Sequence, residues 1–114
     1  MSDTRFDVVG LGNAIVDVFA SVEDSFLAEH DIRKNGMTLI DEDRADALVK
    51  AAPQGPQLSG GSGANTIVGI SSFGGAAAYI GKVADDALGR VFRNDMVESG
   101  IPFDNPPLKD GPAT

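Results

Sequence analysis

The sequence predicts an α/β fold in which helices flank a mostly parallel sheet. Two short apolar runs that contain glycine, at residues 6–12 and 76–82, have the composition of buried strands. Two segments with apolar residues at a 3.6-residue period, at residues 42–52 and 85–99, have the pattern of amphipathic helices. Because strands alternate with helices along the chain, parallel pairing is favoured over hairpins.

Five elements are predicted in the first half of the chain. In order, they are a strand over 6–12, a strand over 14–22, a helix over 24–30, a strand over 37–40 and a helix over 42–52. Asp24 and Asp41 are expected to cap the two helices, because a short carboxylate accepts hydrogen bonds from amides that a helix start leaves unpaired. Asn35-Gly36 predicts a turn, and Pro53 ends the second helix because proline has no amide hydrogen.

The second half is predicted to continue with a glycine-rich loop, a helix, a strand, a helix and a tail. They occupy residues 59–65, 66–73, 76–82, 85–99 and 101–114, in that order. The helix over 66–73 carries small and apolar residues on nearly every side, so we expect it to be buried. Gly74-Gly75 and Gly100 are expected to end the two helices, because glycine adopts the left-handed conformation that closes a helix.

The composition excludes several functional classes. The chain has 114 residues, a length typical of one domain or a part of one, and a net charge of -8 from 9 basic and 17 acidic residues. This acidic balance argues against a nucleic-acid partner, because no basic surface is available to neutralise phosphates. The sequence has no cysteine and a single histidine, His30, so it excludes thiol chemistry, a His-based zinc site and a Ser-His-Asp triad.

The apolar stretches are short. None is long enough to cross a bilayer, and the first residues lack the apolar region of a secretory signal. We therefore expect no membrane partner and a cytoplasmic location.

The first glycine motif, Gly10-Leu11-Gly12, follows a predicted strand. A dinucleotide-binding fingerprint would need a third glycine where Ile15 stands, and it would open a helix rather than a second strand. A tight turn between strands is the simpler structural alternative.

The second glycine motif, at residues 59–65, precedes a predicted helix. Glycine lets backbone amides approach a ligand closely, and a helix N-terminus favours oxygen acceptors. The Gly-Lys-Ser/Thr ending of a Walker loop is absent. By itself, a glycine-rich loop is structural more often than functional.

Taken together and in order, these motifs resemble the N-terminal part of a ribokinase-like carbohydrate kinase of the PfkB family. The segments that carry the resemblance are Gly-Asn-Ala-Ile-Val-Asp at 12–17, Met-Thr-Leu-Ile-Asp-Glu at 37–42, Gly-Gly-Ser-Gly-Ala-Asn at 60–65 and Tyr-Ile-Gly-Lys-Val-Ala-Asp-Asp-Ala-Leu-Gly at 79–89. Within this family, the segments most resemble those of the adenosine-kinase-like branch. Ile67 and Ala84 depart from the family's first signature, and neither is an expected ligand contact.

The resemblance implies that residues 1–114 form the N-terminal segment of a ribokinase-like kinase domain. This segment would hold the substrate cradle and lid strands at about 13–22, 37–41 and 101–114. The C-terminal part, with the ATP site and the catalytic aspartate of a Gly-Ala-Gly-Asp run, is absent from the sequence. We therefore expect no catalytic residue and no metal ligand in this segment, and no kinase activity from it alone.

The residues that the resemblance assigns to substrate binding would contact sugar hydroxyls or form an apolar wall. They are Asn13, Asp17, Met37, Leu39, Gly60, Gly61, Ser62 and Asn65. A carboxylate such as Asp17 accepts two hydrogen bonds from a vicinal diol, and an amide such as Asn13 both donates and accepts. Each has a structural alternative: an outward polar position of the strand for Asp17, a turn for Asn13 and a capping contact for Asn65.

The implied activity of the full-length protein is ATP-dependent phosphorylation of a hydroxyl on a nucleoside or sugar, with adenosine as the leading acceptor. ATP and Mg²⁺ are the implied cofactors, with sites outside this segment. The implied partners are a small-molecule acceptor and a second subunit paired through the lid strands. The alternatives are a sugar kinase of ribose or fructose type and a non-catalytic binding or assembly module.

Overall fold

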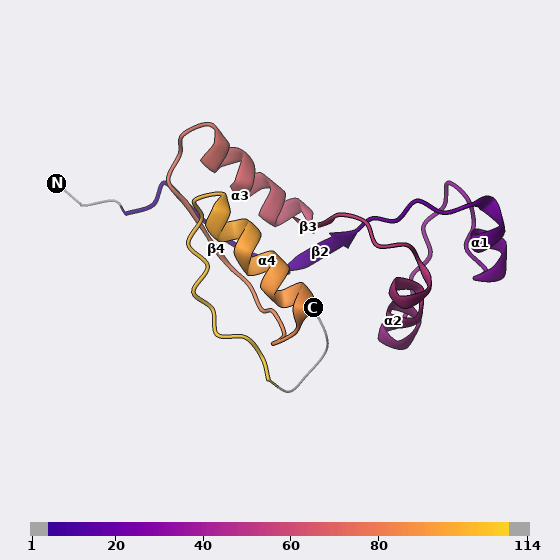
Figure 1. Ribbon diagram of the computed structural model, residues 1–114. Helices are drawn as coiled ribbons and strands as arrows, with labels where there is room; N and C mark the ends of the chain where they lie inside the picture. Colours follow the sequence, from indigo (N-terminus) through magenta and orange to yellow (C-terminus); the bar gives the residue numbers. More distant parts are fainter. Residues whose placement is uncertain (1–4, 110–114) are drawn as a thin grey trace. The chain divides into compact units, whose positions relative to one another are not determined.

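The computed structural model describes residues 5–109 (Figure 1). The chain divides into two compact units. One combines the described parts of Met1–Asp17 and Gln57–Thr114, and the other is Val18–Pro56. Within the described residues, no helix is long and apolar enough to cross a membrane.

The first unit is built on two pairs of strands. Strand β1 (Val8–Leu11) pairs in parallel with β4 (Ala77–Ile80), and Val8 lies opposite Ala77. Strand β2 (Ile15–Val18) pairs with β3 (Gln57–Gly60). The parallel pairing of β1 with β4 confirms the predicted α/β architecture and the strands predicted over 6–12 and 76–82.

Two helices pack on these strands. Helix α3 (Ser62–Ser72) contacts β1 and β4, and α4 (Ala87–Glu98) contacts β3. Asp86 caps α4 by accepting a hydrogen bond from the Gly89 amide at 2.7 Å. Positive φ angles at Gly74 and Gly100 follow the two helices, as predicted.

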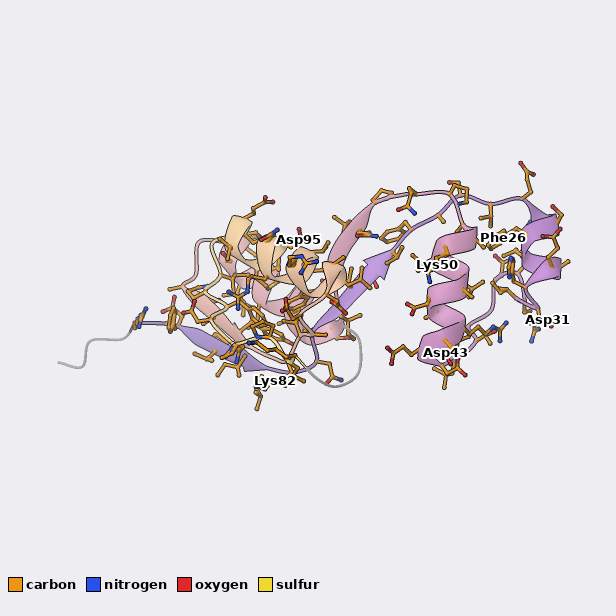
Figure 2. All side chains as sticks on the ribbon, turned by 60° about the horizontal axis from the view of Figure 1, so that its bottom comes forward. Phe26, Asp31, Asp43, Lys50, Lys82 and Asp95 are labelled. Atoms are coloured by element: carbon orange, nitrogen blue, oxygen red, sulfur yellow. The ribbon has the colours of Figure 1, made fainter. Side chains whose placement is uncertain are left out.

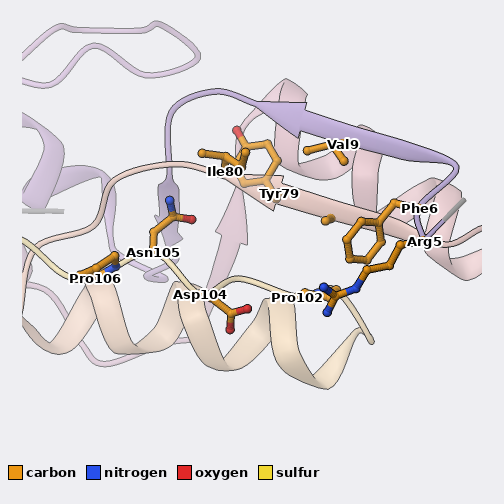
Figure 3. A pocket seen from close by; sticks show the side chains of 10 residues that line it. Arg5, Phe6, Val9, Tyr79, Ile80, Pro102, Asp104, Asn105 and Pro106 are labelled. Carbon is orange, nitrogen blue, oxygen red and sulfur yellow. The ribbon is translucent and has the colours of Figure 1, made fainter. Parts of the chain in front are cut away.

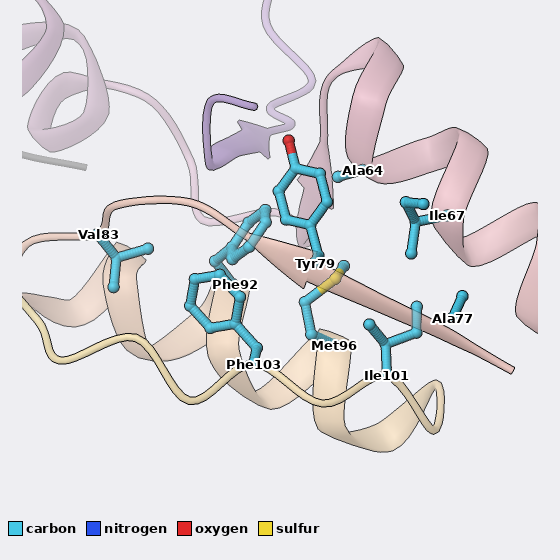
Figure 4. Close-up of a cluster of buried hydrophobic side chains, with 9 residues drawn as sticks. All are labelled: Ala64, Ile67, Ala77, Tyr79, Val83, Phe92, Met96, Ile101 and Phe103. Carbon is cyan, nitrogen blue, oxygen red and sulfur yellow. The ribbon is translucent and has the colours of Figure 1, made fainter. Parts of the chain in front are cut away.

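The core of this unit gathers apolar side chains from both helices, from β4 and from the chain after α4. Its members are Ala64, Ile67, Ala77, Tyr79, Val83, Phe92, Met96, Ile101 and Phe103 (Figure 4). The Phe92 ring meets the Phe103 ring edge-on, with centroids 5.2 Å apart, and lies 6.0 Å from the Tyr79 ring. Such edge-to-face contacts add to the apolar burial of the rings.

The second unit holds α1 (Asp24–Glu29) and α2 (Glu42–Ala51). As predicted, Asp41 caps α2 by accepting from the Arg44 amide at 2.8 Å. The Arg44 guanidinium donates to the carbonyl of His30 at 2.6 Å, and so ties α2 to the end of α1. Neither helix buries a residue fully, and polar side chains such as Asp43 and Lys50 extend from α2 (Figure 2).

Three details of the predicted elements are wrong. The helix predicted over 66–73 already begins at Ser62, because Gly61 turns the chain into it with φ of 90°. It is not buried all round: Phe73 at its end is 94% exposed. The strand at 6–12 was predicted to be buried, but Leu11 is 82% exposed, whereas Ala77, Ala78 and Tyr79 of the partner strand β4 are buried.

The strand predicted over 37–40 is also wrong, since this segment joins no strand pair of the described chain. A strand requires a hydrogen-bonded neighbour, and apolar alternation alone does not provide one. The described part of the tail at 101–114 forms no strand, although Leu108 makes an isolated bridge to Ala84. The rest of the tail, 110–114, lies outside the described residues.

The capping role predicted for Asp24 is wrong as well. Glu23 occupies the N-cap position of α1, and its side chain makes no capping hydrogen bond. Asp24 instead accepts a hydrogen bond from Lys34 at 3.1 Å between exposed side chains. An exposed ion pair of this kind contributes little to stability.

Candidate functional site

The first turn of the candidate site joins β1 to β2. The Gly12 amide donates to the carbonyl of Ile80 at 3.1 Å, and the Tyr79 hydroxyl donates to the carbonyl of Asn13 at 2.9 Å. Asn13 itself is exposed and lines a depression of about 410 Å³ beside Lys82. The backbone of the turn is therefore fixed, while Asn13 stays accessible to a ligand.

The second part of the site is the pairing of Asp17 with Gly60. Asp17 is an exposed residue of β2, and its carboxylate lies directly against the Cα of Gly60 at the end of β3. A methyl group at position 60 would overlap Oδ2 of Asp17 and lie 2.7 Å from its Cγ. Only glycine leaves room for the carboxylate at this point. The β2–β3 pair therefore brings together two predicted site residues that lie 43 positions apart in the sequence.

The third part is the start of α3. Gly61 is the N-cap residue, has φ of 90° and provides no side-chain cap, so its backbone alone opens the helix at Ser62. The first intrahelical bond there runs from the Asn65 amide to the Gly61 carbonyl at 2.9 Å. The preceding amides have no intrahelical acceptor, and together with the helix dipole they attract oxygen atoms of a ligand.

Two predicted residues of the α3 start face solvent. Ser62 and Asn65 are both exposed, and the carbonyl of Ser62 accepts a hydrogen bond from Thr66 Oγ1 at 2.8 Å. Asn65 lines a depression of about 460 Å³ with Ser59 and Asp95, which is not the depression that Asn13 lines. A role for Asn65 beside the other site residues therefore stays a prediction.

Met37 and Leu39 belong to the other unit, Val18–Pro56. They are 87% and 88% exposed, far more than core residues of this size. Their apolar surface is available for a ligand or for another part of a protein. Their contribution to the acceptor site stays a prediction.

Two residues that the sequence analysis did not single out hold the site together. Tyr79 bonds the Asn13 turn, as described above. Asp95 of α4 accepts a hydrogen bond from the Ser59 amide at 2.6 Å, one residue before Gly60. In the sequence, Asp95 could have been found from its position between the apolar residues of α4. Tyr79 could have been found as a lone phenol in an apolar strand, because a buried hydroxyl requires a hydrogen-bond partner.

Burial also affects the chemistry of Tyr79. It raises the pKa of the Tyr79 phenol above the usual value of 10.0. The neutral hydroxyl is therefore the stable form at physiological pH, and it acts as the hydrogen-bond donor to Asn13.

A further depression of about 440 Å³ lies on the β1–β4 pair (Figure 3). Arg5, Phe6 and Asp104 are among the residues that line it. None of the residues predicted to bind the acceptor lines it. It shares Ile80 and Asn105 with the depression that Asn13 lines.

The described residues do not fit a metal cofactor. Between residues 5 and 109, no group of three or more His, Cys, Asp or Glu side chains gathers to hold an ion. Asp17 has a glycine as its close neighbour and no second carboxylate in that contact. The Asp17 carboxylate is a hydrogen-bond acceptor.

Comparison with known proteins connects this geometry to kinases. The model of the pfkB family carbohydrate kinases matches residues 30–112. The crystal structure of adenosine kinase from Sinorhizobium meliloti matches 97% of this chain with a TM-score of 0.78 and 47% identity. That of a probable sugar kinase from Rhizobium etli matches 92% of the chain with a TM-score of 0.74 and 43% identity.

A curated relative, fructokinase-1 from Zea mays, is 30% identical over 110 residues, or 92% of this chain. The chain spans only part of each of these proteins: 34% of the Sinorhizobium enzyme, 32% of the Rhizobium protein and 27% of the maize enzyme. The fold is nevertheless shared over nearly the whole chain. The chain belongs to the pfkB family of carbohydrate kinases.

Proposed function

We propose that this chain is the acceptor-binding part of an ATP-dependent kinase that phosphorylates a hydroxyl group of a nucleoside. The observation that carries the proposal is the contact between the Asp17 carboxylate and Gly60, next to the open amides at the start of α3. A carboxylate beside free amides presents acceptors and donors within one small area. This combination suits a vicinal diol, whose hydroxyls both donate and accept.

Each residue has a defined part in this binding. Asp17 accepts from two hydroxyls of the sugar ring, and the amides around Gly61 donate to a hydroxyl oxygen. Asn13, exposed on the adjoining turn, adds a further donor and acceptor. Fixing the acceptor in this way orients the hydroxyl that is to be phosphorylated, and positioning is the main contribution of a protein to phosphoryl transfer.

Adenosine is the acceptor we favour. Support comes from the 47% identity with the Sinorhizobium adenosine kinase. A sugar acceptor is the second candidate, because the Rhizobium protein, at 43% identity, is described as a probable sugar kinase.

ATP and Mg²⁺ are proposed as cofactors of the whole enzyme. When bound, they supply the transferable phosphoryl group and the charge that neutralises its oxygens. The family resemblance is our reason for placing both sites outside this chain. The chain alone is accordingly expected to consume no ATP, and a cytoplasmic location and pairing with a second subunit stay predictions.

The test is whether the 114-residue chain binds an acceptor. Binding is measured by NMR titration with adenosine and with fructose. Hydrogen bonds to a charged group contribute roughly 1.5–3 kcal/mol, so Asp17→Ala is expected to weaken adenosine binding about tenfold to a hundredfold. Asp7→Ala is the matched control, because Asp7 bonds the Ala76 amide at the far end of β1. Equal affinity of wild type and Asp17→Ala, or no binding of either acceptor, would contradict the proposal.

A further inference from the structure

Tyr79 is the single tyrosine of the sequence and is 2% exposed at the centre of the core. Its ring packs near Phe92 and Phe103, with centroid distances of 6.0 and 6.5 Å. Its hydroxyl points away from these rings (Figure 4) and donates to the Asn13 carbonyl at 2.9 Å. One end of the side chain therefore belongs to the core and the other end to the candidate site.

The hydroxyl end of Tyr79 is enclosed by glycines from both turns of the site. A methyl group on Gly12 would lie 2.5 Å from the hydroxyl oxygen, and one on Gly63 would lie 3.1 Å from it. A methyl group on Gly81 would lie 3.3 Å from Cε2 of the ring. All three distances are below the 3.4 Å of ordinary contact, so the phenol fits closely between the first turn and the start of α3.

We propose that Tyr79 is a positioning residue for acceptor binding: its phenol sets the distance between the Gly12-Asn13 turn and the first turn of α3. This inference rests on the proposed function, because it concerns the same acceptor. Tyr79 does not touch the acceptor in this scheme. It acts through the backbone of Asn13 and through the glycine of α3 that lies against it.

The hydroxyl matters separately from the ring. A phenylalanine at position 79 would keep the core contacts, but the Asn13 carbonyl would lose its donor and the slot between the glycines would lose one atom. A turn without that bond samples a wider range of positions, and small misplacement of ligand groups lowers affinity. A purely structural tyrosine would instead affect the stability of the whole unit.

The experiment compares Tyr79→Phe with wild type in the 114-residue chain. Amide hydrogen exchange is measured at Gly12, next to the turn, and at Ile101, whose amide bonds Met96 in the same core. Losing one hydrogen bond is expected to speed exchange at Gly12 about fivefold more than at Ile101, whose rate reports any change in global stability. Adenosine affinity, measured by NMR titration of the same samples, is expected to fall about fivefold or more.

Ser71→Ala is the matched control, because its hydroxyl also joins two distant segments by donating to a backbone carbonyl, that of Ser99 at 2.8 Å. It is expected to leave both exchange at Gly12 and adenosine affinity unchanged. Unchanged exchange at Gly12 in Tyr79→Phe would overturn the inference. So would faster exchange with unchanged affinity, if Asp17→Ala lowers affinity in the same assay.

Failure of the proposed function gives a different pattern. A wild-type chain that binds no acceptor would overturn the proposed function and, with it, the link from Tyr79 to affinity. The exchange comparison would still decide whether the hydroxyl fixes the turn. Uniformly faster exchange at Gly12 and Ile101 would assign Tyr79 to global stability and overturn the positioning role.

Discussion

Replacing Gly60 by alanine tests the geometry of the site more directly than removing Asp17 does. The new methyl group would overlap Oδ2 of Asp17, and the carboxyl carbon Cγ, at 2.7 Å, would have to retreat to at least 3.4 Å. The carboxylate is the free end of an exposed side chain, so it can move. The substitution therefore leaves the charge in the protein and displaces it by about 0.7 Å or more.

The expected effect is large on binding and small on folding. A charge-assisted hydrogen bond contributes roughly 1.5–3 kcal/mol, and losing its alignment should weaken adenosine binding by about tenfold or more. Gly60 has no positive φ, so alanine fits the backbone there. The stabilisation of about 0.4–1 kcal/mol from a less flexible unfolded chain offsets the side-chain shift, so the free energy of unfolding should change by less than about 1 kcal/mol.

Gly69→Ala provides the control. Gly69 lies inside α3, and nothing stands within 4 Å of the position a methyl group would take. Alanine should stabilise the helix by roughly 0.5–1 kcal/mol and leave acceptor affinity unchanged. Affinity is measured by NMR titration with adenosine, and stability by urea unfolding.

Wild-type affinity in Gly60→Ala would refute this reasoning, because the displaced carboxylate would then not be a ligand. An equal loss of affinity in Gly69→Ala would refute it too, since the effect would come from a general change in the helix. A loss confined to Gly60→Ala, with unfolding free energy preserved, is the outcome the contact between Asp17 and Gly60 requires.

Two further predictions concern the residues that support the site. Burial raises the pKa of Tyr79 above 10.0, so the folded chain holds the phenol proton more tightly than the unfolded chain does. The resulting contribution to the free energy of unfolding is complete below pH 10. It is lost as the pH rises through the pKa of Tyr79 in the folded chain. Absorbance at 295 nm should report that single titration, and the alkaline loss of stability should be smaller in Tyr79→Phe; a native midpoint at or below 10 would contradict the assigned burial effect. Asp95→Ala removes the acceptor that lies 2.6 Å from the Ser59 amide, and it should lower the free energy of unfolding by about 1–3 kcal/mol in urea titrations. Glu98→Ala on the same helix is the control and should change the free energy of unfolding by less than about 0.5 kcal/mol. Equal effects of the two variants would show that the bond contributes little.

The elements that could be predicted from the sequence are those that local chemistry determines. Helix α4 follows from its apolar period and Gly100, and α2 follows from Asp41 and its apolar spacing. Strands β1 and β4 follow from short apolar runs beside glycine. The strand expected over 37–40 failed because pairing depends on a neighbour that alternation does not reveal.

In the candidate site as well, local sequence motifs predicted residues but not the contacts between distant parts of the chain. Asp17 and Gly60 were predicted through motif resemblance, and their contact is a property of the β2–β3 pair. The bonds of Tyr79 and Asp95 join residues 66 and 36 positions apart, so no local pattern contains them. Periodicity marks a residue as facing inward, but it does not identify the backbone group that the residue will bond.

These long-range bonds explain why glycine is concentrated in the site. Tyr79 can reach the Asn13 carbonyl only because Gly12 and Gly63 leave room for its hydroxyl, and Asp17 can lie on β3 only because Gly60 has no side chain. Each glycine removes a methyl group at a point where a polar group crosses between elements. The glycines are therefore required by the side chains that brace the turns as well as by any ligand. It follows that a glycine-rich loop in this fold cannot be assigned to binding from its composition alone: the distinguishing observation is a charged group such as Asp17 that remains exposed after the bracing contacts are made.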